Sequence, residues 1–491
     1  MLAVDVGTSA VKAGLYDALA RVVPYTEARV ANAIRTAQDG TAEVDAGLLA
    51  ANVESAIDTA LQAVAAAGVG VDAVALDSMA STFLGLDRDG RPATPVYLYS
   101  DTRSGPDVEK LRGELDEAAV YDRTGCPQHT SYLPGRIRWL QRTQPDLVNR
   151  VTMWCDVPTY LYRRWLSSAN VPCSYSIASW SGLLDRRRLV WDEFLLAHLR
   201  LDASTFPRLV PYSTLLAGLS REYARRWPSL VSKPFFPGVG DGFAANVGAG
   251  CASPGRVALT IGTTTAMRAV VPDTPERIPS GLWAYRQAPD LTLLGGAFSE
   301  GGNLLLWAKD TLRLPPQEDW DAALSRLPPA AHGLTVLPFL AGERATGWST
   351  GATGVVQGVR VSTTPVEILQ ALMEAVALRA ATVASSLVSA LGTRPEVIAT
   401  GGAIQGSLYW LQTMADVLQM KVSVSSEAQD TSRGTAILAL RSLGAWPALD
   451  YVRPRILGTF TPDPARAAVY GTAAARQRQL YKQVVGKPRF G

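Results

Sequence analysis

The strongest constraint on the fold is a short pattern that occurs once in each half of the chain. The first copy is VDVGTSAVKAGLYD, from Val4, and the second is LTIGTTTAMRAVV, from Leu259. Each copy is a β-prone run, a Gly-Thr turn and a second β-prone run, which predicts a hairpin. The alignment pairs Gly7 with Gly262, Thr8 with Thr263, Ser9 with Thr264 and Asp5 with Thr260. This repeat indicates an internal duplication in which one copy carries an acid.

A duplicated α/β unit predicts two domains that face each other across a cleft. The chain has 491 residues, of which 47% are hydrophobic, and this is enough for two large domains. Alternating patterns near residues 71–87 predict strands, and the pattern from Pro365 predicts a long helix. Pro and Gly cluster at residues 233–255. We therefore expect a layered α/β fold with domains at 1–240 and 241–491. In the tail, from about residue 446, we expect a final helix that packs back onto the second domain.

Charge and composition narrow the class of protein. The net charge is +3 and the arginines are scattered, so no basic stripe predicts nucleic-acid binding. The four cysteines lie far apart, without the spacing of a zinc site or a disulfide framework. The apolar run 371–391 contains Glu374 and Arg379, which favours a buried helix over a membrane span. The N-terminus shows no basic leader before an apolar core, so we expect a cytoplasmic protein.

The two Gly-Thr turns are candidate phosphate sites. Tight turns of this composition can direct several backbone N–H groups and hydroxyls at one anion. A carboxylate beside phosphates needs a cation between them, so Asp5 predicts Mg²⁺, with Lys12 balancing charge across the turn. Alternatively, the glycines only make hairpin turns and Asp5 is a solvated acid. The repeat favours the phosphate interpretation, and neither a Walker loop nor a GxGxxG motif competes with it.

Two further glycine-rich segments carry candidate residues. In GVGDG, Asp241 lies among small residues where a ligand can approach closely, which suits a general base for a hydroxyl. It could equally cap a helix that starts near Phe243, and the two roles are compatible. In TGGAIQG, residues 400–406, a loop before a helix could receive adenine and ribose through backbone contacts, although such a segment is often only a turn.

Taken in order, these motifs resemble the FGGY carbohydrate kinases. The matching segments are DVGTSAVK, GVGDG, TIGTTTA, TGGAIQGSLYW and EAQDTSRGTAILA. Residues 337–359 are similar to that family's Gly-Glu-Arg segment, and residues 174–192 are similar to a segment of its gluconate and xylulose kinases. The resemblance covers nearly the whole chain. It implies two ribonuclease-H-like domains of the actin and sugar-kinase superfamily, with sugar bound mainly by the first and ATP by the second.

The same resemblance assigns roles to individual residues. It implies that Asp241 is the catalytic base and that Asp5 lies near the metal. The residues that it implies for ATP are Thr8, Ser9 and Lys12 on the first turn, Gly262, Thr263 and Thr264 on the second, and Gly302, Gly402, Ala403 and Gly406 on the nucleotide side.

Sugar contacts are predicted in the first domain. Asp101 and Arg103, in YSDTR, match positions where family members contact hydroxyls, and the segment from Thr130 supplies further candidates. Alternatively, Arg103 pairs with Asp101 at the surface. Gluconate and xylulose kinases usually have an aromatic residue or Met followed by His where this chain has Ala80 and Ser81. Ser81 is therefore the substrate candidate here, and the change leaves the identity of the sugar open.

We expect an ATP- and Mg²⁺-dependent kinase that phosphorylates a primary hydroxyl, with gluconate as the leading substrate. Xylulose, ribulose or another polyol is the alternative within the same chemistry. A more remote alternative is a non-catalytic nucleotide switch like actin or the heat-shock ATPases, which share the Gly-Thr hairpins. The expected partners are small molecules, not nucleic acid or membrane, and a homodimer is kept open.

Overall fold

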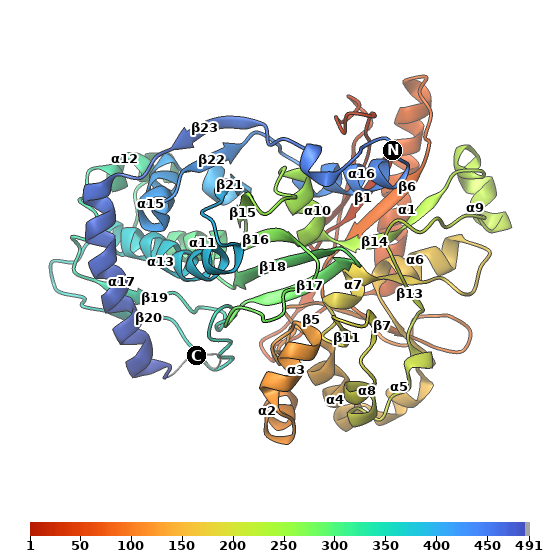
Figure 1. Cartoon of the computed structure of the whole chain (residues 1–491), viewed down its shortest axis with the longest axis horizontal. Coiled ribbons are helices and arrows are strands. Elements are labelled where there is room, and N and C mark those ends of the chain that lie inside the picture. The colour runs from red at the N-terminus through yellow and green to blue at the C-terminus, as the bar shows by residue number, and fades with distance from the viewer. Residues whose placement is uncertain (487–491) are drawn as a thin grey trace.

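A computed structural model describes residues 1–486 and contains two α/β halves, each built on a mixed sheet (Figure 1). In the first sheet the strand order is β14-β6-β1-β2-β3. These strands are β1 (Leu2–Val6), β2 (Ala10–Leu15), β3 (Ala28–Ala31), β6 (Val74–Ser78) and β14 (Phe235–Gly240). The second sheet has the order β17-β18-β16-β15-β21-β22-β23. Its strands are β15 (Arg256–Ile261), β16 (Thr265–Pro272), β17 (Trp283–Ala288), β18 (Leu291–Phe298), β21 (Glu396–Thr400), β22 (Val422–Ser425) and β23 (Ile456–Phe460).

The two sheets share one topology. Strands β1 and β2 form an antiparallel hairpin that β3 extends, and β6 and β14 add parallel strands on the other side. In the second sheet β15, β16 and β18 form the antiparallel part, and β21 and β22 form the parallel part. Both predicted hairpins are confirmed, and the shared order supports the duplication. Two extra strands, β17 and β23, widen the second sheet.

Pairs of parallel strands place polar side chains at equivalent positions in the two halves. In the first sheet, Asp5 of β1 lies beside Asp77 of β6. In the second sheet, Thr260 of β15 lies beside Thr400 of β21, and the two hydroxyls share a hydrogen bond of 3.0 Å. The acid predicted to be present in only one copy is therefore one of a pair of carboxylates, and the second half has a pair of threonines in their place.

Two helices cross between the halves. Helix α10 (Asp241–Gly248) follows β14, and helix α16 (Asp430–Ser442) follows β22, so they occupy equivalent places in the repeat. They pack on each other in the centre of the molecule (Figure 1), and α16 also packs on β1 and β6 of the first sheet. The C-terminal half thus supplies a helix to the core of the N-terminal half.

The long predicted helix is α13 (Pro365–Leu391), and it belongs to the core of the second half. It begins with a capping box between Thr364 and Glu367 and ends at Gly392 in the left-handed conformation. Among the described residues it is the one helix long and apolar enough to span a membrane. However, 67% of its apolar 18-residue stretch is buried inside the protein. It is a core helix, as its charged residues predicted.

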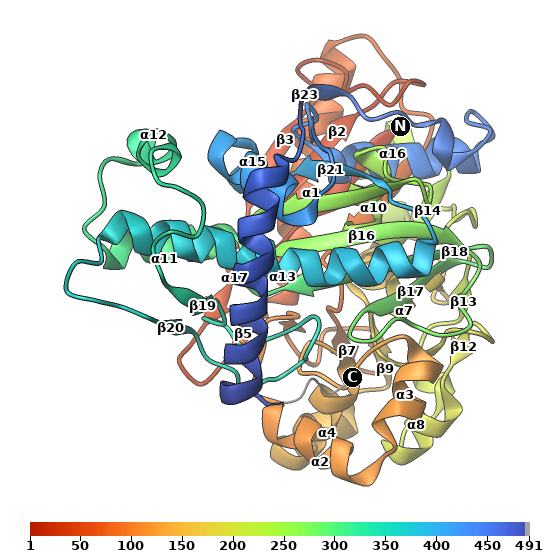
Figure 2. The ribbon, with the colours of Figure 1, turned by 60° about the vertical axis from the view of Figure 1, so that its left-hand side comes forward.

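The C-terminal tail ends in helix α17 (Pro464–Val484), which packs on α13, α15 (Leu408–Leu418) and β19 (Thr335–Leu337). Figure 2 shows α17 lying along the second half and crossing α13. The predicted final helix and its packing are confirmed. Strand β23, which the tail adds to the sheet edge, was not predicted, because its five residues follow a proline and four of them are exposed.

Helices inserted between β6 and β14 enlarge the first half on the side that faces β17. The helices of the first half include α1 (Ala46–Ala66), α2 (Gly105–Glu114), α3 (Glu117–Thr124), α4 (Leu133–Thr143), α6 (Val157–Trp165) and the short α7 (Tyr175–Ser179). Helix α7 packs on β17 of the second sheet, so the halves are in contact on this side too. Since β14 ends at Gly240 and β15 begins at Arg256, the boundary at 240/241 lies between the sheets and stays a prediction.

Candidate active site

A cavity of about 110 Å³ lies between the two halves. Residues before β15 line it with Ala80, Ser81, Tyr99, Trp180 and Asp241, and residues after β15 line it with Thr264, Ala266, Arg268, Trp283, Ala297 and Arg344. It therefore contains the predicted base, the substrate candidate Ser81 and one residue of the second Gly-Thr turn. Ligand sites commonly form at such boundaries between domains.

Asp241 is the first residue of α10, with Gly240 at the N-cap position. Its Oδ1 accepts hydrogen bonds from the backbone N–H of Gly242, at 2.7 Å, and of Ala80, at 3.3 Å. Withdrawal from water raises the pKa of Asp241 to about 6, although the Arg268 guanidinium opposes the rise and the charge on Asp5 adds to it. A carboxyl with a pKa in this range is a competent general base near neutral pH.

Two guanidinium groups face the same cavity. Arg268 lies on β16, and its Nη1 donates to the Thr260 hydroxyl at 3.3 Å. Burial lowers the pKa of Arg268 to about 10, which leaves it charged at neutral pH. Arg344 belongs to the Gly-Glu-Arg segment, and its Cζ lies 5.6 Å from the ring centroid of Tyr99 in the first half. The cavity thus holds one acid that can act as a base and two permanent cations.

Within the described residues, the buried polar side-chain atoms of the cavity that have no hydrogen-bond partner are all donors. They are Nε1 of Trp180, Nε1 of Trp283, Nε of Arg268 and Nε of Arg344. Buried donors without partners are costly, so such a group points to a ligand that supplies acceptors. The two indole rings lie 5.4 Å apart, and each stacks on Tyr285, so these walls are held in place.

The predicted metal residue Asp5 lies in an acidic cluster next to Asp241. Its Oδ2 lies 3.3 Å from Nζ of Lys12, across the hairpin. Asp77 is fully buried, and its Oδ2 accepts a hydrogen bond of 2.6 Å from the hydroxyl of Thr435 on α16. Burial, together with the charge on Asp5, raises the pKa of Asp77 well above its usual range. Oδ1 of Asp77 has no hydrogen-bond partner among residues 1–486.

Several of the residues predicted for the nucleotide lie together beside the second turn. The N–H of Gly302, at the start of α11 (Gly302–Thr311), donates to the Gly262 carbonyl at 2.7 Å, and a Cβ on Gly302 would lie 3.1 Å from that of Ala403. Gly402 and Ala403 begin α14 (Gly402–Gln405), and Gly406 ends it. Thr263 and Thr264 complete the second turn, and Thr8 and Ser9 lie in the first. Contact of these residues with ATP stays a prediction.

The residues predicted for the sugar separate into two groups. Ser81 lines the cavity in a left-handed backbone conformation with φ of 58°, and its hydroxyl donates to the Trp180 carbonyl at 2.8 Å. Arg103 and Asp101 are not among the residues that line it. Arg103 donates to Asp101 at 2.6 Å and to Glu43 at 2.7 Å. The predicted pair exists, but it is not at the surface, since Asp101 is buried at 1% exposed and Arg103 is half-buried at 16% exposed. A sugar contact by these two residues stays a prediction.

Sequence reasoning missed several residues of the site. They are Asp77, Trp180, Arg268, Trp283 and Arg344. For two of them a signal was present: Asp77 interrupts the buried strand VALDS, and Arg268 interrupts the strand TAMRAVVP. A charge inside a buried strand needs a partner or a ligand. Arg344 lay within a segment that was noted only as a family motif.

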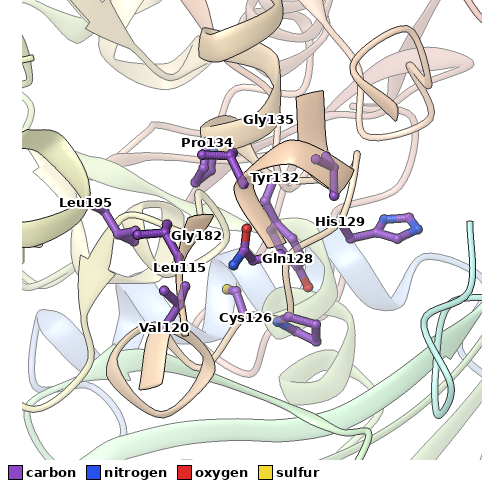
Figure 3. Close-up of a pocket in the computed structure, with 13 residues that line it drawn as sticks. Leu115, Val120, Cys126, Gln128, His129, Tyr132, Pro134, Gly135, Gly182 and Leu195 are labelled. Carbon is purple, nitrogen blue, oxygen red and sulfur yellow. The ribbon is translucent and has the colours of Figure 1, made fainter. Parts of the chain in front are cut away.

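A second, smaller cavity lies within the first half, among α2, α3 and α4 (Figure 3). It encloses about 20 Å³, enough for one water molecule. Its walls are mainly apolar, from residues such as Leu115, Val120 and Leu195. The side-chain amide of Gln128 lies at its centre in Figure 3 and has no hydrogen-bond partner in the described part of the chain. Tyr132, Pro134 and Gly135, from the segment after Thr130 that was predicted to supply sugar contacts, line this cavity and not the one at Asp241. The site residues predicted individually do not line it, so the two cavities are separate.

The fold and the cavity define a protein of two ribonuclease-H-like halves with an acidic, arginine-lined site between them. The chain belongs to the FGGY family of carbohydrate kinases: the model of the family's N-terminal domain matches residues 1–248 and that of its C-terminal domain matches residues 257–443. It is accordingly a sugar kinase, a phosphotransferase, as the motifs predicted.

Individual relatives agree with this placement. A gluconokinase from Bacillus licheniformis is 26% identical over 482 residues, covering 94% of this chain and 91% of its own length. The fold is similar to a xylulose kinase from Lactobacillus acidophilus, with a TM-score of 0.92 at 23% identity over 99% of this chain and 98% of that one. It is also similar to a Plasmodium falciparum glycerol kinase solved with ADP, with a TM-score of 0.84 at 20% identity over 98% and 97%.

Proposed function

We propose that this chain transfers the γ-phosphoryl group of ATP to a primary hydroxyl of a sugar acid, with gluconate as the preferred substrate. The observation that carries the proposal is the pair of guanidinium groups, Arg268 and Arg344, in the cavity that also contains Asp241. A neutral polyol gives these cations only hydroxyl oxygens. A carboxylate gives them charge-assisted hydrogen bonds, which are about twice as strong as neutral ones.

The other walls of the cavity suit the rest of such a substrate. The unpartnered indole N–H groups of Trp180 and Trp283 can donate to hydroxyl oxygens. Ala80 and Ser81 stand where the gluconate and xylulose kinases of the resemblance usually have an aromatic residue or Met followed by His, so their imidazole contact is absent. Arg268 and Arg344 then supply the charge that recognises the substrate. The gluconokinase relative is consistent with this substrate class.

Asp241 acts as the base in this proposal. Its carboxylate is fixed by the N–H groups of Gly242 and Ala80, so it can accept the proton of the attacking hydroxyl while that oxygen bonds to the γ-phosphorus. The bond between the γ-phosphorus and the bridging oxygen of ADP breaks in the same step. The Arg268 guanidinium keeps Asp241 more acidic than burial alone would, and therefore ionised at pH 7.

ATP and Mg²⁺ fit the residues around the two turns. No atom of residues 1–486, the two chain neighbours aside, lies within 4 Å of a Cβ position on Gly262, which leaves the backbone of the second turn open to phosphates. Gly302 packs behind this turn, where an added Cβ would lie 2.8 Å from the Gly262 carbonyl. Among residues 1–486 no group of three or more His, Cys, Asp or Glu side chains could enclose a metal. Asp5 therefore suits Mg²⁺ held by one carboxylate, water and phosphate oxygens. The ion would neutralise phosphate charge there.

The proposal also includes a cytoplasmic location, with the sugar acid and ATP as the partners of the enzyme. Whether the enzyme forms a homodimer is left open.

The test is an ADP-release assay over sugar acids, ketopentoses, polyols and aldoses. The proposal expects the highest kcat/KM for a sugar acid. A neutral ketose or polyol with the highest value would overturn the substrate assignment, and ATP turnover that no sugar stimulates would overturn the reaction itself.

A further inference from the structure

We propose that Tyr481, in the last turn of α17, is a positioning residue for the substrate site, because it fixes the segment that carries Arg344. The family match ends at residue 443, so this helix lies outside it. The inference rests on the proposed function, in which Arg344 binds the anionic end of the substrate. Tyr481 is buried, and its hydroxyl donates to Oε2 of Glu343 at 2.7 Å.

The segment that carries Arg344 has little regular structure of its own. Residues 343–350 contain no helix and no strand, so side-chain contacts must hold them in place. One backbone bond, from the Ala345 N–H to the Ala297 carbonyl at 3.0 Å, ties the segment to β18. Within the turn, the Trp348 N–H donates to the Arg344 carbonyl at 2.7 Å. The Trp348 indole also donates to the Gly281 carbonyl at 2.8 Å, and the contacts of Glu343, next to Arg344, add to these anchors.

Glu343 is the point where three parts of the second half meet. One carboxylate oxygen accepts from Arg379 of α13 and from the Gly347 N–H, and the other accepts from Tyr481. The Arg379 guanidinium lies 5.3 Å from the centre of the Tyr481 ring. A Cβ on Gly347 would overlap both the Tyr481 hydroxyl and the Glu343 carboxylate, so the turn is closed tightly around this pair.

The other end of the segment reaches the first half. Arg344 lies over the ring of Tyr99, and the Thr350 hydroxyl donates to Glu109 of α2 at 3.3 Å. The segment thus connects α17 on one side with the wall of the cavity on the other. Loss of the Tyr481 hydroxyl removes one of the contacts that hold Glu343, and Arg344 then samples positions from which it cannot bind the substrate.

The test compares Tyr481→Phe with Tyr470→Phe. Both variants remove one hydroxyl from α17, and Tyr470 also donates to a buried glutamate, Glu374 at 3.1 Å, but away from Arg344. The substrate is whichever sugar the wild type uses best. We expect Tyr481→Phe to raise the KM for that sugar about 10-fold, with kcat within about 3-fold and the KM for ATP within about 2-fold of the wild type. Tyr470→Phe should leave all three unchanged.

Hydrogen exchange of the ligand-free enzyme gives a second readout. Backbone amides of residues 343–349 should exchange faster in Tyr481→Phe and not in Tyr470→Phe. An unchanged sugar KM in Tyr481→Phe, unchanged exchange, or equal effects in both variants would each overturn the positioning role. Failure of the proposed function is visible separately, because it appears in the wild type as a preference for a neutral sugar.

Discussion

Gly248 and Gly434 lie against each other where α10 crosses α16. A Cβ on Gly248 would lie 2.9 Å from the Gly434 nitrogen and would overlap the Asp430 carbonyl, and a Cβ on Gly434 would lie 2.8 Å from the Gly248 nitrogen and would overlap the Ala244 carbonyl. The helices from the two halves therefore meet backbone to backbone, and both positions require glycine.

Gly434→Ala is expected to destabilise the protein for this reason. An added methyl group must push the helices apart, at a cost of about 1 to 3 kcal/mol, despite the better helix propensity of alanine. Differential scanning calorimetry should show a lower melting temperature. Gly471→Ala in α17 is the matched control, because no atom lies within 4 Å of its Cβ position, and it should be neutral or stabilising. Equal melting temperatures for the two variants would contradict the close crossing.

Asp241→Asn should lower kcat by about 10² to 10⁴, because the amide keeps the shape of the side chain and loses its basicity. Sugar and ATP should still bind within a few-fold of wild type. Calorimetric titration must measure that binding, since KM departs from the dissociation constant when chemistry changes speed. A variant that keeps more than about a tenth of the wild-type kcat would show that Asp241 is not the base.

The pKa of Asp241 predicts the pH dependence of activity. The base must be ionised, and its pKa is about 6, so kcat/KM should be constant above pH 7 and fall tenfold per unit below pH 6. The Arg268 charge lowers this pKa. In Arg268→Met the acidic limb should therefore move to higher pH, by about 1 unit. An acidic limb that stays in place, or that moves to lower pH, would show that the Arg268 charge does not lower the pKa of Asp241.

Arg103→Ala is expected to act on stability. It leaves the buried Asp101 carboxylate without its cation and Glu43 with only the exposed Arg35, which costs up to about 3 to 5 kcal/mol. The control is Arg91→Ala, which breaks an exposed pair with Asp89 worth less than about 1 kcal/mol. If instead Arg103→Ala is as stable as the control and its sugar KM rises 10-fold or more, the predicted sugar contact is the right interpretation.

Local patterns predicted those parts of the fold that local contacts determine. The two hairpins and the helix from Pro365 follow from turn residues and periodicity that lie within one segment. Asp241 was found for the same reason, since GVGDG marks a close approach by itself. The repeat of one pattern predicted two similar α/β domains, and the family resemblance implied their ribonuclease-H-like topology.

The missed residues depend on distant parts of the chain. Asp77 matters because β6 pairs with β1 and because Thr435 reaches it from α16, and neither contact is visible in VALDS alone. Trp180 and Trp283 meet at the cavity although they come from different halves. Conversely, Asp101 and Arg103 in YSDTR suggested a sugar site. In the structure Arg103 also pairs with Glu43, so its charge has a partner within the protein.

The most direct measurement of the central claim is the ratio of kcat/KM for gluconate to that for glucitol, its neutral counterpart with a hydroxymethyl group in place of the carboxylate. In the wild type we expect a ratio of about 100 or more, because charged hydrogen bonds are worth roughly 1.5 to 3 kcal/mol each. In Arg268→Met the ratio should fall at least 10-fold, mainly through loss of activity on gluconate. A wild-type ratio near one, or a ratio that Arg268→Met leaves unchanged, would contradict recognition of a sugar acid by this cavity.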